Sequence, residues 1–202
     1  MPHLYLRRCR SQTEEKGKYM PAKQYQEPPS LILDPTMKYS ATIKTDHGDM
    51  TIELFPADAP RAVNNFVFLA REGFYQGNCF HRVLKDFMIQ GGCPKGDGTG
   101  GPGYRFPDEE IKRSYVKGTL AMANSGPNTN GSQFFVVHGQ QIGLPPNYTI
   151  FGQLSQGEDT LDTLANSEVG AGSGGERSRP AQRLEIQNIE ILEQPINSGG
   201  NQ

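Results

Sequence analysis

Residues 80–92, F-H-R-V-L-K-D-F-M-I-Q-G-G, place one basic side chain in a run that is otherwise typical of a sheet interior. The apolar members of the run are Phe80, Val83, Leu84, Phe87, Met88 and Ile89. The guanidinium of Arg82, set among them, is expected to be partly desolvated, where its five N–H donors act more strongly than in water. Gln90 adds a neutral amide before two glycines end the strand. Taken alone, the pattern also fits an arginine that ends a strand and extends to solvent.

Residues 118–138, G-T-L-A-M-A-N-S-G-P-N-T-N-G-S-Q-F-F-V-V-H, form a second informative stretch, in which two β-like runs flank a polar loop. Together the two stretches resemble the cyclophilins, the cyclosporin-binding peptidyl-prolyl cis-trans isomerases. The resemblance rests on F-H-R-V-x-x-x-F-M-I-Q-G-G followed by M-A-N-x-G-P-N-T-N-G-S-Q-F-F, and it covers residues 38–193.

The resemblance implies a fold, an activity and a set of site residues. The fold is mainly β: a closed eight-stranded antiparallel β-barrel capped by two α-helices. The activity is isomerisation of Xaa-Pro bonds without a cofactor or metal, with Arg82 as the catalytic donor to the proline nitrogen. The residues implied to bind substrate are Phe87, Met88, Phe135 and Leu144 around the proline ring, Gln90, Gly98, Ala123, Asn124 and Gln133 along the peptide, and Tyr148 as an aromatic wall.

Two positions depart from the family pattern. Where most members carry a tryptophan that borders the pocket and donates to cyclosporin, ungapped alignment places Gly143, and where they carry a pocket histidine it places Tyr148. Gly143 leaves a gap, so cyclosporin is expected to bind more weakly than it does to typical members. His81 lies beside Arg82, but the resemblance implies that this position packs inside the barrel.

The periodicity of the chain independently predicts short strands and two helices. Alternation in residues 39–44 and 50–54 around D-H-G-D predicts a β-hairpin, and helical spacing between Asp58 and Gly73 predicts a helix that buries Phe66 and Leu69. A shorter helix is predicted over residues 159–166, with Leu161, Leu164 and Ala165 inward. Further strands are predicted over residues 80–84, 87–90, 119–123, 133–138, 149–154 and 184–192, the last with a bulge. Tight turns between many short strands are typical of a barrel. Residues 170–175, G-A-G-S-G-G, are predicted to form a flexible surface loop.

The 202 residues fit a single domain with flanking segments. We expect an extended or partly disordered arm over residues 1–37, an isomerase domain over 38–194 and a tail over 195–202. Prolines between residues 21 and 35 forbid a helix there. The arm either presents Pro28-Pro29 to a proline-recognition module or, as we favour, lies across the barrel as a strap anchored by Leu31, Ile32 and Leu33.

Charge and cysteine usage restrict the classes of partner. A net charge of −2 and a pI near 6.1 give no general expectation of binding to nucleic acid or an anionic membrane. No apolar run approaches the length of a membrane span, and the basic N-terminal residues lack the apolar region of a secretory signal. The cysteines, Cys9, Cys79 and Cys93, form no C-x-x-C pair. These features predict a cytoplasmic monomer with free thiols and no metal site.

Two functional hypotheses follow. The first is an isomerase that assists slow, proline-limited folding steps and therefore binds proline-containing peptides and unfolded or nascent proteins. The second is a non-catalytic binding module or chaperone that holds Pro-containing segments in the same groove. The presence of Arg82 and Gln90 favours the enzyme, whereas Gly143 slightly favours the binding module.

Overall fold

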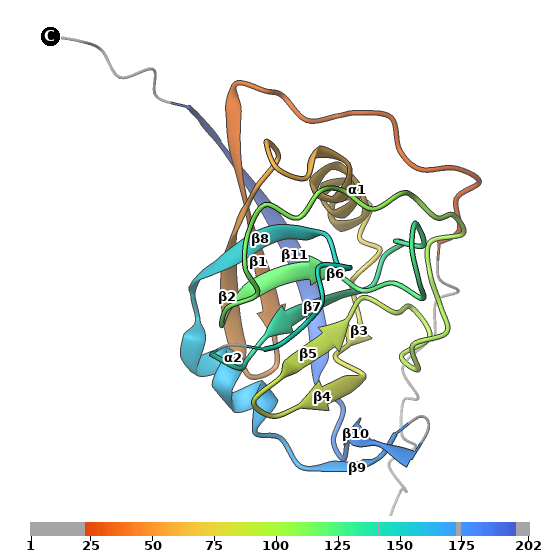
Figure 1. Cartoon of the computed structure of the whole chain (residues 1–202), viewed down its shortest axis with the longest axis vertical. Helices are drawn as coiled ribbons and strands as arrows, with labels where there is room; N and C mark the ends of the chain where they lie inside the picture. Colours follow the sequence, from red (N-terminus) through yellow and green to blue (C-terminus); the bar gives the residue numbers. More distant parts are fainter. Residues whose placement is uncertain (1–22, 141, 173–174, 197–202) are drawn as a thin grey trace, which may run out of the picture.

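The computed structural model describes residues 23–140, 142–172 and 175–196 of the chain. Its secondary structure, drawn in Figure 1, is mainly β with two helices. In chain order the elements are β1 (Met37–Thr45), β2 (Gly48–Leu54), α1 (Pro60–Arg71), β3 (Asn78–Cys79), β4 (Arg82–Leu84), β5 (Met88–Gly91), β6 (Thr119–Met122), β7 (Phe134–Val137), β8 (Ile150–Gln156), α2 (Glu158–Ala165), β9 (Val169–Ala171), β10 (Arg177–Pro180) and β11 (Glu185–Pro195).

The predicted hairpin is confirmed as β1 and β2, which pair antiparallel on either side of a short turn. Their alternate apolar residues face the core, and Ile43, Met50 and Ile52 are fully buried. Ile43 is the register partner of Met50 across the two strands. Period-two alternation therefore places one face of this hairpin in the core and the other at the surface.

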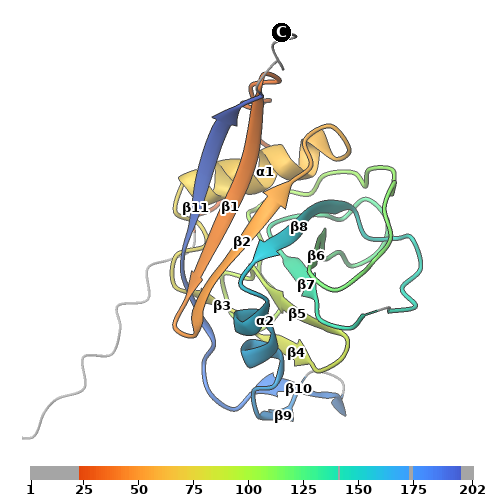
Figure 2. The same ribbon diagram turned by 90° about the vertical axis from the view of Figure 1, so that its left-hand side faces the viewer.

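The main sheet contains nine strands in the order β3-β11-β1-β2-β8-β6-β7-β5-β4, and it is strongly curled (Figures 1 and 2). The sequence predicted eight strands and missed β3, whose residues 78–79 precede the strand predicted over residues 80–84. Within this segment the backbone instead changes partner: Phe80 N donates to Leu184 O beside β11, and His81 N donates to Gln90 O on β5, each over 3.0 Å. The two edge strands, β3 and β4, are therefore consecutive in the sequence.

The double glycine ends β5, as the sequence predicts. Gly92 has φ +79°, a conformation that residues with a Cβ rarely adopt, and a Cβ built there would lie 2.4 Å from Ser132 O. The carbonyl of Gly92 accepts a 2.7 Å hydrogen bond from the Ser132 hydroxyl. Close approach of two backbones thus requires glycine at this position.

Helix α1 starts at Pro60 and buries one side inside the curled sheet. Its N-terminus has no cap from its own flanking residue. The carboxylate of Glu109 takes this role from a distant loop, because it accepts 2.9 Å hydrogen bonds from both Arg61 N and Ala62 N. The predicted burial of Phe66 and Leu69 is confirmed, since both are 0% exposed.

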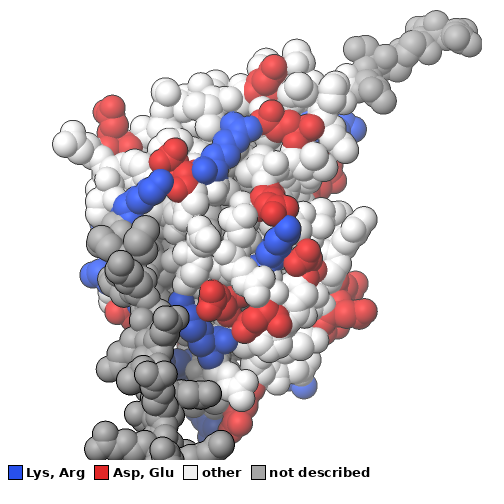
Figure 3. Space-filling model, turned by 180° about the vertical axis from the view of Figure 1, so that it is seen from behind, with Lys and Arg blue, Asp and Glu red and all other residues white. Residues whose placement is uncertain are grey.

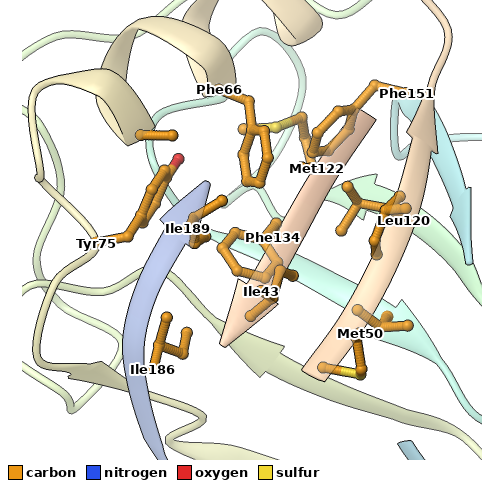
Figure 4. Packing of buried hydrophobic residues seen from close by; sticks show 14 of the residues in the cluster. Ile43, Met50, Phe66, Tyr75, Leu120, Met122, Phe134, Phe151, Ile186 and Ile189 are labelled. Carbon is orange, nitrogen blue, oxygen red and sulfur yellow. The ribbon is translucent and has the colours of Figure 1, made fainter. Parts of the chain in front are cut away.

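The centre of the core is aromatic (Figure 4). The ring of Phe66 on α1 contacts three others, with centroid distances of 5.3 Å to Tyr75, 5.5 Å to Phe134 and 5.2 Å to Phe151. Phe134 meets Phe66 edge to face at 88°. These contacts join α1 to β7 and β8 across the inside of the curled sheet.

Helix α2 lies at the end of the sheet opposite α1 (Figures 1 and 2). Leu161, Leu164 and Ala165 are buried as predicted. The register of β11 against β1 shifts between Lys44 and Thr45, which confirms the predicted bulge in the last strand. The periodicity therefore located both helices and the irregular strand correctly.

The prediction of a loop over residues 170–175 was wrong in part. Residues up to Ala171 belong to β9, which pairs antiparallel with β10 in a separate two-stranded sheet. Gly172 N donates to Glu176 O over 2.7 Å. Backbone pairing with β10, which composition does not reveal, orders this glycine-rich segment at its two ends.

Residues 23–36 run over α1 and the loop around Pro102. The ring of Tyr25 packs edge to face on Phe68 at 5.2 Å, and Tyr25 N donates to Pro102 O. The proposed apolar anchors are wrong for two of three residues, because Leu31 is 71% and Ile32 39% exposed, while Leu33 packs against the core. The remainder of the predicted arm, residues 1–22, and most of the predicted tail lie outside the described residues.

Residues 29–32 are held by hydrogen bonds between their backbone and the side chain of Asn64, and not by burial of apolar side chains. Asn64 of α1 is buried, and its side chain accepts from Ile32 N at 2.8 Å and donates to Ser30 O at 2.9 Å. The amide therefore satisfies the segment's polar groups while Leu31 and Ile32 point outward.

The surface has a mixed charge. On the face shown in Figure 3, acidic and basic side chains are interspersed among uncharged residues. Among the described residues, neither helix has the length and apolar character needed to cross a bilayer.

Candidate active site

Arg82 begins β4 and lies directly opposite Gln90 in the antiparallel pairing of β4 with β5. Because residues in register share one face of the sheet, their side chains lie close together. Arg82 Nη1 donates to Gln90 Oε1 over 3.3 Å, and the arginine side chain is 36% exposed. The guanidinium is therefore held at the surface of the sheet, half out of water.

A chain of side-chain amides continues from this contact. Gln90 Nε2 donates to Gln133 Oε1 over 3.1 Å. Gln133 Nε2 in turn donates to the carbonyl oxygens of Gly98 at 2.8 Å and Gly100 at 2.9 Å. These bonds fix the direction of both amides and attach the loop that contains Gly98 to the strands.

The predicted proline-pocket residues come together in one apolar cluster, separate from the main hydrophobic core. It contains buried Met88 and Phe135 and the partly buried residues Phe87, Ala123, Leu144 and Tyr148. The rings of Phe135 and Tyr148 meet edge to face, with centroids 5.5 Å apart and planes at 86°. Phe134 and Phe135 are adjacent on β7, so the first faces the main hydrophobic core and the second faces this cluster.

A cavity of about 970 Å³ lies beside the cluster. Five of the predicted substrate residues line it: Gln90, Gly98, Ala123, Asn124 and Gln133. The structure therefore divides the predicted residues into a polar groove and an apolar cluster, and Arg82 contacts Gln90 of the groove.

Ala123 and Asn124 are held by bonds to two other segments. Ala123 N donates to Gln133 O over 3.0 Å. Asn124 Nδ2 donates to Asn147 O over 2.8 Å, which connects the groove to the loop that carries Tyr148. The side chain of Asn124 therefore has a supporting role in the groove wall.

The two departures from the family pattern lie in the same loop. Gly143 is exposed, and a Cβ built there would have no heavy atom within 4 Å. Tyr148 is fixed by Tyr115, whose hydroxyl donates to Tyr148 O at 2.7 Å and accepts from Tyr148 N at 3.0 Å. Sequence reasoning missed Tyr115 because it lies between charged residues with no periodicity around it.

Two further residues of the site were also missed. Gln24 lines the cavity, and its Nε2 donates to Gly101 O over 2.9 Å. Glu176 forms a two-point ion pair with Arg82, at 2.8 Å to Nε and 3.0 Å to Nη2. This hydrogen bonding from Arg82 lowers the pKa of Glu176 below its usual value. Both contacts join residues more than 70 positions apart, which no local pattern indicates.

His81 is partly buried, with its ring against Gly98, where an added Cβ would lie 3.3 Å from His81 Nε2. Burial lowers the pKa of His81 below its usual 6.5, so the ring is neutral at pH 7. Cys79 and Cys93 are buried free thiols. Within the described part of the chain, no three His, Cys, Asp or Glu side chains come together as metal ligands do.

Comparison with known proteins identifies the family. Residues 40–191 match the model of the cyclophilin type peptidyl-prolyl cis-trans isomerase family. The chain is 41% identical over 162 residues to the Arabidopsis thaliana peptidyl-prolyl cis-trans isomerase CYP18-1, which covers 78% of this chain and 98% of that protein. It is 40% identical over 198 residues to a Streptococcus pyogenes protein whose name joins a phosphatase to a peptidyl-prolyl cis-trans isomerase, covering 82% of this chain and only 41% of that protein.

A solved structure supports the same assignment. The crystal structure of a Cryptosporidium parvum cyclophilin type peptidyl-prolyl cis-trans isomerase, determined in the presence of the dipeptide Ala-Pro, superposes with a TM-score of 0.69 at 38% identity. The match covers 77% of this chain and 99% of that one. With the family model spanning most of the sequence, the chain belongs to the cyclophilin-type peptidyl-prolyl cis-trans isomerases.

Proposed function

We propose that this isomerase accelerates rotation about Xaa-Pro bonds by donating a hydrogen bond from Arg82 to the proline nitrogen as the bond twists. Rotation faces a barrier of about 18–20 kcal/mol because the nitrogen lone pair is delocalised into the carbonyl. In the twisted transition state the lone pair is localised on nitrogen and accepts a hydrogen bond. A donor that acts only then lowers the barrier without tightening substrate binding.

The observation that carries the proposal is the hydrogen bond from Arg82 to Gln90, a groove residue, on the face of the β4–β5 pair that also carries Met88 of the apolar cluster. The cluster around Phe135 and Met88 suits a proline ring. The groove lined by Gln90 and Gln133 suits the flanking peptide, whose backbone needs polar partners. A peptide that used both would place its prolyl bond next to the guanidinium.

Substrate positioning contributes the rest of the rate enhancement. A preorganised donor is worth about 2.7–4 kcal/mol of transition-state stabilisation, or about 100–1000-fold in rate. The amide chain from Gln90 to Gly98 fixes the groove before substrate arrives, so little reorganisation is needed on binding.

The proposal extends to clients, cellular location and drug binding. The clients are proline-containing segments of unfolded or nascent proteins. The protein acts as a cytoplasmic monomer without a role for nucleic acid or membrane. Cyclosporin binds weakly because Gly143 supplies no indole.

The proposal also concerns the closure of the main sheet. Residues 78–84 act as one bent strand that closes the sheet as an eight-stranded barrel. The bonds from Phe80 to Leu184 and from His81 to Gln90 support this closure.

Substitution of Arg82 tests the mechanism. Arg82→Ala should lower kcat/KM for a Pro-containing tetrapeptide by about 100–1000-fold, with a much smaller change in peptide affinity. Arg82→Lys should recover little activity, because an ammonium on a flexible stem does not reproduce a planar fork. Arg71→Ala is the control, since Arg71 is also an exposed arginine paired with a glutamate, Glu193, but lies on α1.

Isomerisation and peptide binding should be measured on the same three variants. An unchanged isomerisation rate in Arg82→Ala would remove the mechanism. A purely binding function predicts the reverse pattern, with no turnover before or after substitution and a loss seen only in affinity.

A further inference from the structure

Glu176 contacts Arg82 from outside the strands that form the rest of the site. Its two carboxylate oxygens accept from Arg82 Nε at 2.8 Å and from Nη2 at 3.0 Å. This two-point geometry matches the planar fork of a guanidinium to a carboxylate and restricts its rotation. The residue lies at neither the apolar cluster nor the polar groove.

The two-stranded sheet of β9 and β10 brings Glu176 to this position. Residue 176 directly precedes β10, which lies beside β4 in both ribbon views (Figures 1 and 2). The backbone is fixed at this point because Gly172 N donates to Glu176 O over 2.7 Å. Ser178, two residues further on, is buried. The carboxylate is thus held by a folded segment.

The hydrogen bonds of Arg82 show which part of the guanidinium stays available. A guanidinium has five N–H donors. Glu176 takes the edge formed by Nε and Nη2, and Gln90 takes one N–H of Nη1. One N–H on Nη1 and one on Nη2 remain, and that of Nη2 lies on the outer edge of the fork, opposite the side chain's own stem.

We propose that Glu176 is a positioning residue for isomerisation. Its carboxylate binds the edge of the Arg82 guanidinium formed by Nε and Nη2, so that the outer edge, formed by Nη1 and Nη2, faces the prolyl bond. The proposal rests on the role assigned to Arg82 above. Without the carboxylate, a long side chain that is 36% exposed would sample several rotamers, and the donor would be aligned in only a fraction of the molecules.

The contact is suited to positioning more than to holding the fold together. Both partners are more than a third exposed, and ion pairs of this kind contribute little to stability. The pair also balances the positive charge beside an apolar cluster, which lowers the cost of excluding water when a neutral prolyl ring binds. Loss of Glu176 should therefore change turnover and leave folding nearly unchanged.

A double-mutant cycle tests the proposal. Glu176→Gln keeps the size of the side chain but replaces one acceptor by a donor, so we expect kcat to fall about tenfold with KM nearly unchanged. Glu176→Asp keeps the charge directly after Gly175, and it should recover most of this loss. In an Arg82→Ala background, Glu176→Gln should change kcat by less than about twofold, because the group that it positions is gone.

The readouts are kcat and KM from NMR exchange spectroscopy on an Xaa-Pro peptide, with the melting temperature of each variant. Glu190→Gln is the matched control, because Glu190 forms an exposed ion pair at 2.7 Å with Lys44 on strands that carry none of the proposed site residues. It should leave kcat unchanged.

Each alternative result is distinct. Equal losses from Glu176→Gln with and without Arg82 would show a structural effect and overturn the proposal. A rise in kcat/KM would overturn it too, since the carboxylate would then compete with substrate for the guanidinium. If Arg82→Ala itself has no effect, the proposed mechanism fails, whereas a loss in Arg82→Ala with none in Glu176→Gln refutes only the positioning role.

Discussion

Two adjacent phenylalanines on β7 test whether one face of the strand contributes mainly to folding stability and the other to peptide binding. Phe134 is fully buried in the main hydrophobic core, and Phe135 is 4% exposed in the apolar cluster outside it. The two differ only in the face of the strand from which they project. Replacing each by alanine removes the same atoms from two different environments.

The expected losses follow from the contacts of each ring. Phe134 meets three aromatic rings, with centroids 5.5 Å away for Phe66, 5.6 Å for Tyr75 and 6.3 Å for Phe80 (Figure 4). Burial in such a core places Phe134→Ala at the upper end of the range for large-to-small substitutions, about 4–5 kcal/mol. Phe135 has one aromatic partner, Tyr148, so Phe135→Ala should cost about 3 kcal/mol.

Urea unfolding gives the stability of each variant, and titration with a Pro-containing peptide gives its affinity. A loss of about 4–5 kcal/mol approaches the whole stability of an ordinary domain, about 5–15 kcal/mol, so leucine variants are measured alongside. These should cost less than about 1.5 kcal/mol each. Phe135→Leu should weaken peptide binding severalfold, and Phe134→Leu should leave it unchanged.

Equal effects of the two leucine variants on peptide affinity would refute the division into a core face and a binding face. A larger stability loss at Phe135 than at Phe134 would contradict the contact argument as well.

Three further predictions concern the rim, the N-terminal segment and pH. Gly143→Trp should tighten cyclosporin binding by about 2 kcal/mol, the contribution of an anchoring aromatic, because a side chain there meets no neighbour; nanomolar binding by the unchanged protein in a fluorescence titration would refute this. Tyr25→Ala should lower the free energy of unfolding by about 2 kcal/mol through loss of its contact with Phe68, and equal urea midpoints would contradict it. The lowered pKa of His81 means that the unfolded state takes up more protons below pH 6.5, so stability is complete above that pH and falls as the pH decreases. His81→Gln should flatten this decline in urea titrations between about pH 7.5 and 5, and an unaltered slope would show that other groups cause it.

Local patterns in the chain predicted most of the secondary structure but missed β3, β9 and β10. Alternating and helical periodicity located the hairpin, both helices and the bulge in β11, because these signals depend on residues a few positions apart. The two long motifs indicated the family, and with it Arg82, Gln90 and the apolar cluster around Phe135. Their placement in one region of the fold agrees with that inference.

Tertiary packing, by contrast, sets how distant segments complete the site. Glu176 reaches Arg82 across 94 positions because β10 packs beside β4, and Gln24 reaches Gly101 across 77 positions. The sequence also did not reveal that Leu31 is exposed. The buried side-chain amide of Asn64 binds the backbone of Ser30 and Ile32, so Leu31 is not needed as an apolar anchor. Local patterns record which face of an element is apolar, whereas contacts between polar side chains depend on where packing places each loop.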